Sequence, residues 1–306
     1  MRPPFPTAID NSLLSEWRSC PRKAQLSYLE HWKPARKSVH LHAGGAFAKG
    51  LEVARRAFYE ERLSPEDSVA AGLGALLRFY GDFDCPEDSA KSATRMCQAL
   101  EYYFSAWPLA EDRAIPYQLK SGRRAIEFSF VEPLEVAHPE TGEPILYSGR
   151  ADMIASMSNG IFVEDDKTST ALGAGWANQW DNRAQFTGYV WAARQGGIPV
   201  DGILVRGVAI LKTMFKHEQY ITYRAQWEID RWLEQTNRDL KRMIQAWDTG
   251  YFDYNLSDAC GSFGGCHFRQ VCKSQQPEEW LNMYFERRRR DPVTRTETVL
   301  PLPERP

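Results

Sequence analysis

The sequence predicts an α/β protein with a mixed β-sheet, and three of its features support this. Between residues 122 and 211, four apolar runs bounded by Gly, Pro, Asn and Asp are typical of strands. Residues 176–196 lie between the third run and the fourth and show helical periodicity, which indicates a helix that connects two strands. Upstream, residues 43–107 repeat apolar side chains at helical spacing. We therefore expect a sheet flanked by helices, with a helical insertion before it.

The individual elements can be assigned in chain order. Residues 10–33 predict two short helices, which begin near the capping residues Asp10 and Ser12 and are separated by Cys20 and a proline. After the helical region come the expected strands, at residues 123–136, 145–157, 161–167, 202–211 and 217–224. Residues 225–250 then predict a long helix that ends at Gly250.

Bulk composition narrows the class of protein. The chain has 306 residues, of which 43% are hydrophobic, enough for a sizeable core. Its 38 Lys and Arg residues against 40 Asp and Glu residues give a formal charge of -2, so binding to nucleic acid requires a local basic patch. No signal peptide and no membrane-spanning apolar run is visible, so a cytoplasmic location without membrane contact is expected. In that reducing compartment, clustered cysteines indicate metal binding more than disulfides.

The segment IFVEDDK at 161–167 carries the clearest chemical pattern. If it is a strand, Asp165 and Lys167 share one face, while Glu164 and Asp166 share the other. Asp152 lies on the preceding expected strand, which could run beside it. Two carboxylates converging from neighbouring strands suit Mg²⁺ or Mn²⁺, and a lysine beside them can orient or help deprotonate an attacking water. A D-x-K pattern alone is most often a solvated strand end. The pattern becomes specific only as part of an ordered set, with the acid on the preceding strand and the helix that follows.

The helix that follows adds a further pair to this set. Gln185 and Tyr189 are four residues apart and so share one helical face. A core tyrosine on an ordinary helix is the structural alternative for this pair.

This ordered set resembles the RecB-like branch of the PD-(D/E)xK nucleases, which includes nuclease domains of bacterial recombination helicases and CRISPR-associated exonucleases. GRAD at 149–152 matches the first acidic motif of that family, DDK at 165–167 its D-x-K motif, and QFTGY at 185–189 its Q-x-x-x-Y motif. The resemblance implies a restriction-endonuclease-like fold. It also implies that Mg²⁺ or Mn²⁺ is held by Asp152, Asp165 and the carbonyl of Asp166.

The resemblance also implies roles for the remaining motif residues and contains one departure. Lys167 would serve the attacking water, and Gln185 and Tyr189 would position the DNA strand or the lysine. The family usually has a metal-binding histidine in an upstream helix, but aligning GGAFAKGLE to that pattern puts Ala48 at its position and Glu52 at the closing acid. His40 and His42 are out of register. The missing ligand predicts weaker metal binding, another metal preference or lower activity.

The cysteines form a second constellation. Cys260, Cys266 and Cys272 follow a C-x5-C-x5-C spacing, and Cys20 lies 240 positions upstream of the first. Because C-x2-C pairs typical of zinc are absent, four thiolates at looser spacing favour a 4Fe-4S cluster. The resemblance supports this, since cluster-containing RecB-like nucleases take one cysteine before the core and three after it. A zinc site that recruits His267, and a set of unrelated buried thiols, are the alternatives.

These interpretations predict a single domain over residues 1–290, with a disordered tail at 291–306. Within it we expect a helical insertion at about 43–115, a nuclease core at about 116–225 and cluster segments at about 12–35 and 255–275. A helical segment at 280–290 ends in four arginines, which could contact phosphates or complement the end of a helix.

The expected function is a DNA exonuclease that acts on DNA ends or single strands, with a role in DNA recombination and repair. No Walker P-loop is present, so unwinding would need a helicase or recombination partner. A non-catalytic DNA-binding or assembly protein of the same fold is the second hypothesis. A zinc-stabilised interaction module is the third.

Overall fold

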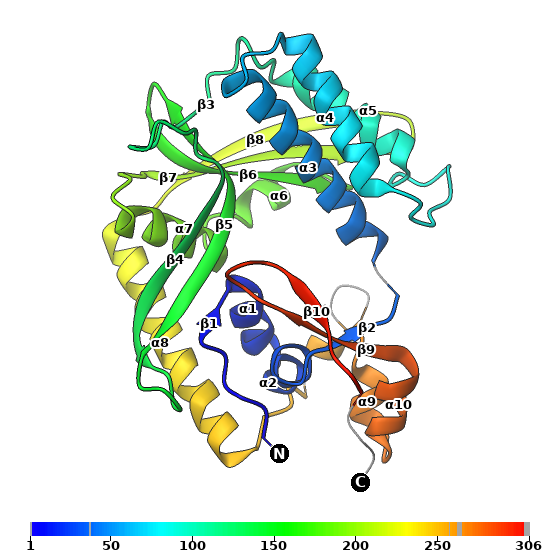
Figure 1. The fold of residues 1–306 in the computed structure, drawn as a ribbon, viewed down its shortest axis with the longest axis vertical. Helices are drawn as coiled ribbons and strands as arrows, with labels where there is room; N and C mark the ends of the chain where they lie inside the picture. Colours follow the sequence, from blue (N-terminus) through cyan, green and yellow to red (C-terminus); the bar gives the residue numbers. More distant parts are fainter. Residues whose placement is uncertain (1, 37, 257, 262–264, 303–306) are drawn as a thin grey trace. The chain divides into compact units, whose positions relative to one another are not determined.

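The computed structural model describes residues 2–36, 38–256, 258–261 and 265–302 (Figure 1). Its internal contacts divide the chain into two compact units. Unit 1 contains Met1–Arg36, Val131–Gly149 and Asp230–Pro306, and unit 2 contains Lys37–Phe130 and Arg150–Ile229. In the described part of the chain, no helix is long and apolar enough to cross a membrane.

Three helices open unit 2, as the helical periodicity predicts: α3 (Val39–Tyr59), α4 (Pro65–Tyr80) and α5 (Ala93–Ala106). Serine side chains cap two of them, because Ser64 Oγ accepts from the N–H of Asp67 and Ser92 Oγ from the N–H of Arg95. The first two helices approach closely at a pair of glycines. A Cβ on Gly72 would lie 2.7 Å from the carbonyl oxygen of Gly50, so a larger residue there would push the helices apart.

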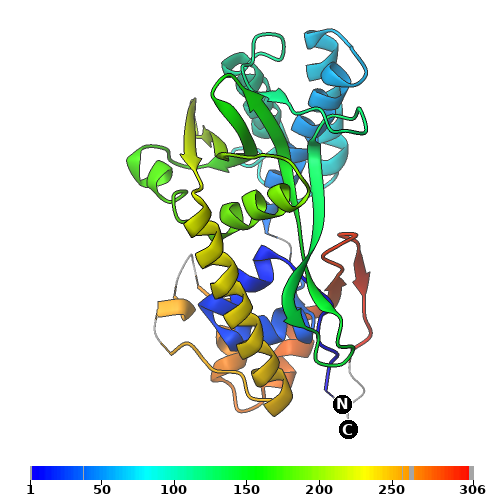
Figure 2. The same ribbon diagram turned by 90° about the vertical axis from the view of Figure 1, so that its left-hand side faces the viewer.

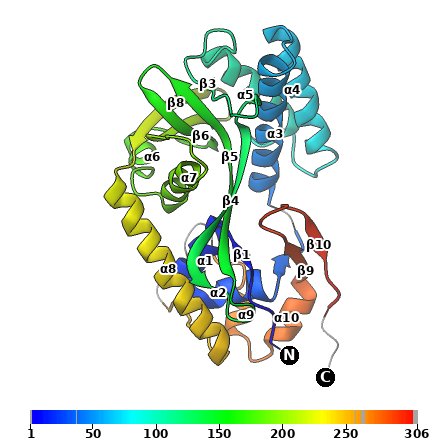
Figure 3. The same ribbon diagram turned by 60° about the vertical axis from the view of Figure 1, so that its left-hand side comes forward.

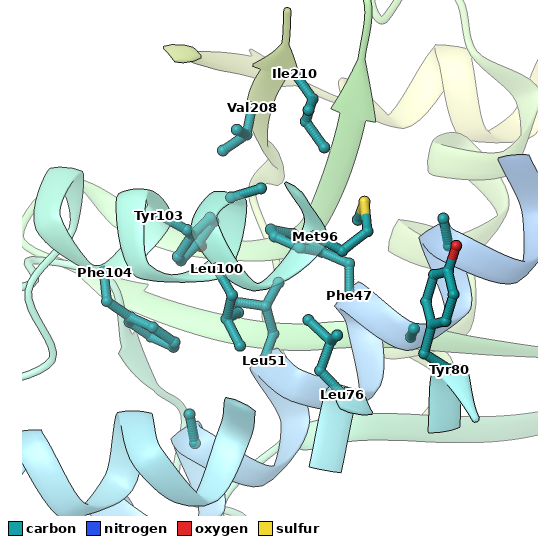
Figure 4. Packing of buried hydrophobic residues seen from close by; sticks show 14 of the residues in the cluster. Phe47, Leu51, Leu76, Tyr80, Met96, Leu100, Tyr103, Phe104, Val208 and Ile210 are labelled. Carbon is teal, nitrogen blue, oxygen red and sulfur yellow. The ribbon is translucent and has the colours of Figure 1, made fainter. Parts of the chain in front are cut away.

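The helices bury a continuous apolar cluster against the sheet (Figure 4). Phe47 and Leu51 of α3, Leu76 of α4 and Leu100 of α5 are almost inaccessible to solvent. The cluster continues onto the sheet through Val208 and Ile210, both of which Figure 4 labels. This apolar packing fixes α3 and α5 on one face of the sheet.

The main sheet has the strand order β1-β5-β6-β7-β8, with β3 and β4 also paired to β5. Pairing is antiparallel for β5–β6 and β7–β8 and parallel for β6–β7 and β1–β5, so the sheet is mixed as expected. Its strands are β1 (Ala8–Ile9), β3 (Ile115–Pro116), β4 (Ile126–Ala137), β5 (Pro144–Met157), β6 (Gly160–Ser169), β7 (Gly202–Ile210) and β8 (Phe215–Tyr223).

The parallel pair β6–β7 requires a crossover, which two helices provide: α6 (Ala174–Asn178) and α7 (Ala184–Gln195). The helical stretch expected at 176–196 is therefore broken at residues 179–183. In Figure 3, α7 and α3 lie on opposite sides of the strands. The sheet is thus covered by α7 on one face and by the α3–α5 helices on the other.

Unit 1 is assembled from the two ends of the chain together with residues 131–149 of β4, β5 and their connection. Asp10 Oδ1 caps α1 by accepting from the N–H of Leu13 at 2.9 Å, and the long helix α8 ends before Gly250, whose φ is 74°. The remaining elements of this unit are α1 (Asn11–Ser19), α2 (Pro21–Ala24), a π-turn (Gln25–Leu29), β2 (Trp32–Pro34), α8 (Gln226–Thr249), a 3₁₀ turn (Asp258–Cys260), α9 (Arg269–Lys273), α10 (Pro277–Tyr284), β9 (Phe285–Arg290) and β10 (Glu297–Val299).

The C-terminal segment differs from the sequence expectation in two places. The arginine-rich residues 285–290 form strand β9 rather than the end of a helix, because they pair with β2 and Phe285 is buried. Residues 297–299, expected in a disordered tail, form β10, which pairs with β9 (Figure 2, red). Residues 303–306 of that expected tail lie outside the described residues.

Candidate active site

The acid and the lysine of the D-x-K segment meet on the α7 side of β6. Asp165 and Lys167 project from the same face, as expected from strand alternation, and their side chains form an ion pair. The Asp165 side chain is 5% exposed and that of Lys167 is 34% exposed. The pair therefore sits at the boundary between core and solvent, where a substrate can reach it.

Asp152 reaches the same place from β5. The β5–β6 register pairs Met153 with Glu164, which puts Asp152 beside Asp165. Asp152 Oδ2 accepts a hydrogen bond from the N–H of Asp166 at 2.8 Å, which fixes the carboxylate against β6. Burial, followed by the charges of Asp165 and Asp166, raises the pKa of Asp152 well above its usual value.

Lys167 offsets part of this negative charge. Burial lowers the pKa of Lys167, but the carboxylates of Asp165 and Asp152 outweigh burial and the pKa is raised. Burial raises the pKa of Asp165 in spite of the opposing effect of Lys167. One lysine thus faces two carboxylates, a charge imbalance that a divalent cation would correct.

The motif pair on α7 lies next to this group. Gln185 Nε2 donates to the hydroxyl of Tyr189 at 3.0 Å, and Tyr189 is buried. Burial and then Asp165 raise the pKa of Tyr189 to about 12, so its hydroxyl remains protonated at neutral pH. The structure therefore brings all five motif side chains together.

Two neighbours of the site were not identified in the sequence. Arg183, the exposed residue before α7, lowers the pKa of Asp165 electrostatically, so it lies within range of the site. Glu127 on β4 raises the pKa of Asp152 and forms an ion pair with Arg150. Its φ of 54° is unusual for a residue other than glycine. Neither residue belongs to a spacing motif, so only tertiary contact reveals them.

The opposite face of β6 carries a buried ionic network. Arg55 of α3 donates to Asp166 Oδ2 at 2.7 Å, to Glu164 Oε1 at 2.5 Å and to the hydroxyl of Tyr103 at 2.7 Å. Tyr103 in turn donates to Asp166 Oδ1 at 2.7 Å. The side chains of Arg55, Glu164 and Asp166 are at most 4% exposed.

A second arginine extends this network. Arg206 of β7 forms two 2.6 Å hydrogen bonds to the carboxylate of Asp112 and lies 3.6 Å from Glu164. It is one of the largest fully buried side chains of the described chain. An arginine in the middle of the apolar strand GILVRGVAI is a usable sequence signal, because a buried guanidinium must be paired.

The upstream helix α3 contributes Arg55 to the opposite face of β6, and neither His42 nor Glu52 on this helix is free to act as the expected ligand. His42 Nε2 donates a 2.9 Å hydrogen bond to the carbonyl of Tyr80, and its ring stacks on Phe83. Glu52 forms ion pairs with Lys49 and Arg56 on its own helix. The structural interpretation of His42 is therefore favoured.

The donor set of the site can be compared with the needs of a metal ion. Within the ranges that the structure describes, no three His, Cys, Asp or Glu side chains form a group that could hold a metal. Asp152 and Asp165 supply two carboxylates, and Mg²⁺ is commonly bound by one or two carboxylates plus water and substrate phosphate. The Asp166 side chain faces Arg55, so only its main chain faces this group.

The four clustered cysteines all lie in unit 1 and are free thiols. After burial, the charges of Cys260 and Cys20 contribute to the raised pKa of Cys266, and Cys266 and Cys20 to that of Cys272. The main chain also links two of them, since the N–H of Cys266 donates to the carbonyl of Cys260 at 3.0 Å. The thiols share one neighbourhood, but the described residues do not form a metal-holding group there. Residues 262–264, between two of these cysteines, are not described.

Comparison with known proteins identifies the class to which this fold and site belong. The PD-(D/E)XK nuclease superfamily matches residues 11–273. A crystal structure from Eubacterium rectale, provisionally named an exonuclease, aligns over 83% of this chain and 87% of its own with a TM-score of 0.50 and 12% identity, which supports the fold alone. The structure of SSO0001 aligns over 65% of this chain and 74% of its own at 17% identity, but its TM-score of 0.27 is too low to support a shared fold. No curated protein sequence is significantly similar to the chain.

The chain therefore belongs to the PD-(D/E)XK nuclease superfamily. Proteins of this superfamily typically use Mg²⁺ or Mn²⁺ to hydrolyse phosphodiester bonds. The family match covers both the site of unit 2 and the four clustered cysteines.

Proposed function

We propose that this chain is a DNA exonuclease of the RecB-like branch, acting on DNA ends or single strands. The observation that carries the proposal is the convergence of Asp152, Asp165 and Lys167 on one partly open face of β6. Two carboxylates that can hold a divalent cation and a lysine that can serve the attacking water form a workable centre for metal-assisted phosphodiester hydrolysis. The Eubacterium rectale structure of similar fold is provisionally named an exonuclease, which agrees with this proposal.

Each residue has a separate role in this proposal. A divalent cation, when bound, would polarise the phosphate and lower the pKa of water. Asp152, Asp165 and the Asp166 carbonyl would hold it. Lys167 would orient the attacking water and balance the negative charge that builds up on the phosphate. Tyr189, held by Gln185, would position the lysine or the DNA strand.

The test is degradation of end-labelled single-stranded and duplex DNA by the pure protein, with Mg²⁺, Mn²⁺ or EDTA. We expect metal-dependent release of labelled nucleotides from ends, and no cleavage of a circular single strand. Cleavage of the circle would overturn the exonuclease assignment but retain a nuclease. No cleavage with either metal would favour a non-catalytic DNA-binding or assembly protein, for which the Ala48 substitution provides a reason.

We also propose that Cys20, Cys260, Cys266 and Cys272 bind a 4Fe-4S cluster. Support comes from the free thiols and from the electrostatic contact among all four. A cluster, when bound, would join the two chain ends of unit 1 and couple ligation to folding. Its role would be structural.

Anaerobic purification tests the cluster directly. We expect a brown protein with about four irons per chain. Changing any one of the four cysteines to serine should remove the colour, whereas the matched changes Cys85→Ser and Cys97→Ser should keep it. Zinc in place of iron and sulfide would contradict the proposal.

Free cysteines also fit a cytoplasmic location. A helicase partner would supply the unwinding of duplex DNA.

A further inference from the structure

The turn between α6 and α7 carries an arginine, Arg183, that the proposed catalytic chemistry does not use. A helix that connects two parallel strands runs back along them, so α7 begins at the carboxyl ends of β6 and β7. It packs against both strands (Figure 3). Asp165 and Lys167 lie toward this end of β6, on the face that α7 covers. Arg183, which directly precedes α7, therefore lies at the same end of the sheet as the candidate active site.

A continuous set of contacts connects Lys167 to Arg183. The β6–β7 register pairs Lys167 with Gly207, and a Cβ on Gly207 would lie 2.4 Å from the Trp176 ring, so this indole lies directly on the glycine. The rings of Trp176 and Trp180 meet edge to face, with centroids 5.5 Å apart. The Arg183 guanidinium lies 6.0 Å from the centroid of the Trp180 ring. Both tryptophans are buried, so they support Arg183 and are not free to stack on bases.

Arg224 fixes the main chain of this turn. Its guanidinium donates to the carbonyl of Trp180 at 2.7 Å and to Thr187 Oγ1 of α7 at 3.0 Å. The N–H of Arg183 donates to the same carbonyl at 3.3 Å. Arg224 is 3% exposed, and its hydrogen bonds all go to uncharged oxygens. It therefore holds the start of α7 in place, and its positive charge forms no ion pair with the described carboxylates.

The Arg183 side chain itself is exposed and unpaired. Within the ranges that the structure describes, its guanidinium forms no hydrogen bond and no ion pair. The carboxylate of Asp181 in the same turn accepts from the hydroxyl of Tyr220 at 2.8 Å instead. The charge of Arg183 nevertheless reaches the site, because it opposes the raised pKa of Asp165. Its N–H donors are available to an acceptor that enters from solvent.

With Arg183 included, positive charge at the site matches negative charge. Glu127 is already in an ion pair, which leaves Asp152 and Asp165 opposite Lys167. Arg183 is the second, more distant cation on this face. A divalent cation, when bound by the two aspartates, would make the site positive, which is the sign that a phosphate group requires.

We propose that Arg183 binds a phosphate of the DNA strand next to the phosphate that is cleaved, and so positions the strand across Asp165 and Lys167. The inference rests on the proposed function for the identity of the substrate. Arg183 forms no ion pair with Asp165, so it lies outside the group that would contact the reacting phosphate. Guanidinium groups bind phosphate through paired hydrogen bonds, which hold a strand without reading its sequence. Such a contact is present before and during the reaction, so its loss should weaken binding and leave the chemical step unchanged.

The first measurement is equilibrium binding of a labelled oligothymidylate to the full chain in EDTA, where metal-dependent cleavage cannot occur. The variant is Arg183→Gln, and the matched control is Arg78→Gln, at an exposed arginine of α4 in the same unit. For single strands, each lost phosphate contact lowers the salt dependence of log K by about 0.7. We expect Arg183→Gln to lose about this much from the slope and about tenfold in affinity, as for a hydrogen bond to a charged group. Arg183→Lys should retain the slope, because it keeps the charge.

The second measurement is steady-state degradation of the same oligonucleotide with Mg²⁺. We expect Arg183→Gln to raise KM about tenfold at unchanged kcat, and Arg78→Gln to change neither. A lower kcat at unchanged KM would overturn the proposal, since Arg183 would then act on the reacting phosphate.

The outcomes separate this proposal from the nuclease assignment. Binding that depends on Arg183 in a protein that cleaves nothing would support the phosphate contact and overturn the nuclease. Unchanged slope and affinity in Arg183→Gln, an equal loss in Arg78→Gln, or a slope that Arg183→Lys does not restore would overturn the phosphate contact. If thymidine monophosphate displaces the oligonucleotide at concentrations comparable to its own, the contact is a mononucleotide site and the positioning of a strand is overturned.

Discussion

On one face of β6, Glu164 and Asp166 share two arginines and a tyrosine, whereas on the other face Asp165 and Asp152 share a single lysine. The first group is closed to solvent, and Lys167 in the second is one-third exposed. Buried charge is tolerated where it is paired and costs free energy where it is not. We call the face with Arg55 and Arg206 the arginine face and the face with Lys167 the lysine face. The difference indicates that the arginine face holds the strand in place, while the lysine face is available to a cation and a substrate.

The largest effect should come from the lysine face. We predict that Asp165→Asn, or Asp152→Asn, lowers cleavage by about 10³-fold or more, because a ligand of the cation that would polarise the phosphate and activate water is lost. The melting temperature of the metal-free protein should stay equal or rise, since repulsion between two buried carboxylates is removed. Cleavage assays and thermal melts measure these two effects, and calorimetric Mg²⁺ titration measures the affinity for the metal. Unchanged metal affinity would show that these carboxylates are not ligands.

The arginine face should respond in stability. Arg55→Met would leave Glu164 and Asp166 buried without their main partner, and we predict a loss of about 3–5 kcal/mol in the free energy of unfolding. Urea denaturation measures it. The matched control is Arg56→Met, the next residue on α3, whose half-buried ion pairs with Glu52 and Glu60 should be worth about 1 kcal/mol or less. Similar losses in the two variants would remove the distinction between the faces.

A smaller effect should separate the lysine from the carboxylates beside it. Lys167→Met should slow cleavage by about 100-fold while Mg²⁺ binding is kept or strengthened, because a cation next to the site is removed. Single-turnover rates at saturating metal isolate the chemical step. A loss of metal affinity as large as that of Asp165→Asn would mean that Lys167 organises the site rather than serving the reaction.

The smallest effect concerns pH. Burial raises the pKa values of Asp152 and Asp165 above the unfolded value of about 4, and the charge of Asp165 adds to the shift of Asp152. The stability these groups contribute is therefore present at low pH and lost as pH rises through their folded pKa values. A cation binds the deprotonated pair. We therefore predict that the increase in melting temperature caused by Mg²⁺ grows as pH rises above the unfolded pKa of about 4, and that Asp165→Asn flattens this trend. An increase independent of pH in the unmodified protein would contradict the raised pKa values.

Sequence reasoning identified the lysine face and missed the arginine face. Asp165 and Lys167 could be placed together because alternation along a strand is a local property, and Asp152 because antiparallel neighbours bring adjacent segments into register. For Glu164 and Asp166, alternation predicts only that their side chains point away from the face of Asp165 and Lys167. Strand alternation alone predicts only mild effects on cleavage from changes at these two positions, but their ion pairs with Arg55 make such changes costly to stability.

The sequence by itself determined the long strands β4 to β8, the main helices and the five side chains that meet at the site, since these depend on periodicity and on spacing within short segments. Only the tertiary structure decided that Arg55 and Arg206 pair with the back of β6, because their partners are up to 111 residues away. The same holds for β9. Four consecutive arginines after a helix favour its continuation locally, but pairing with β2, some 250 residues upstream, makes them a strand.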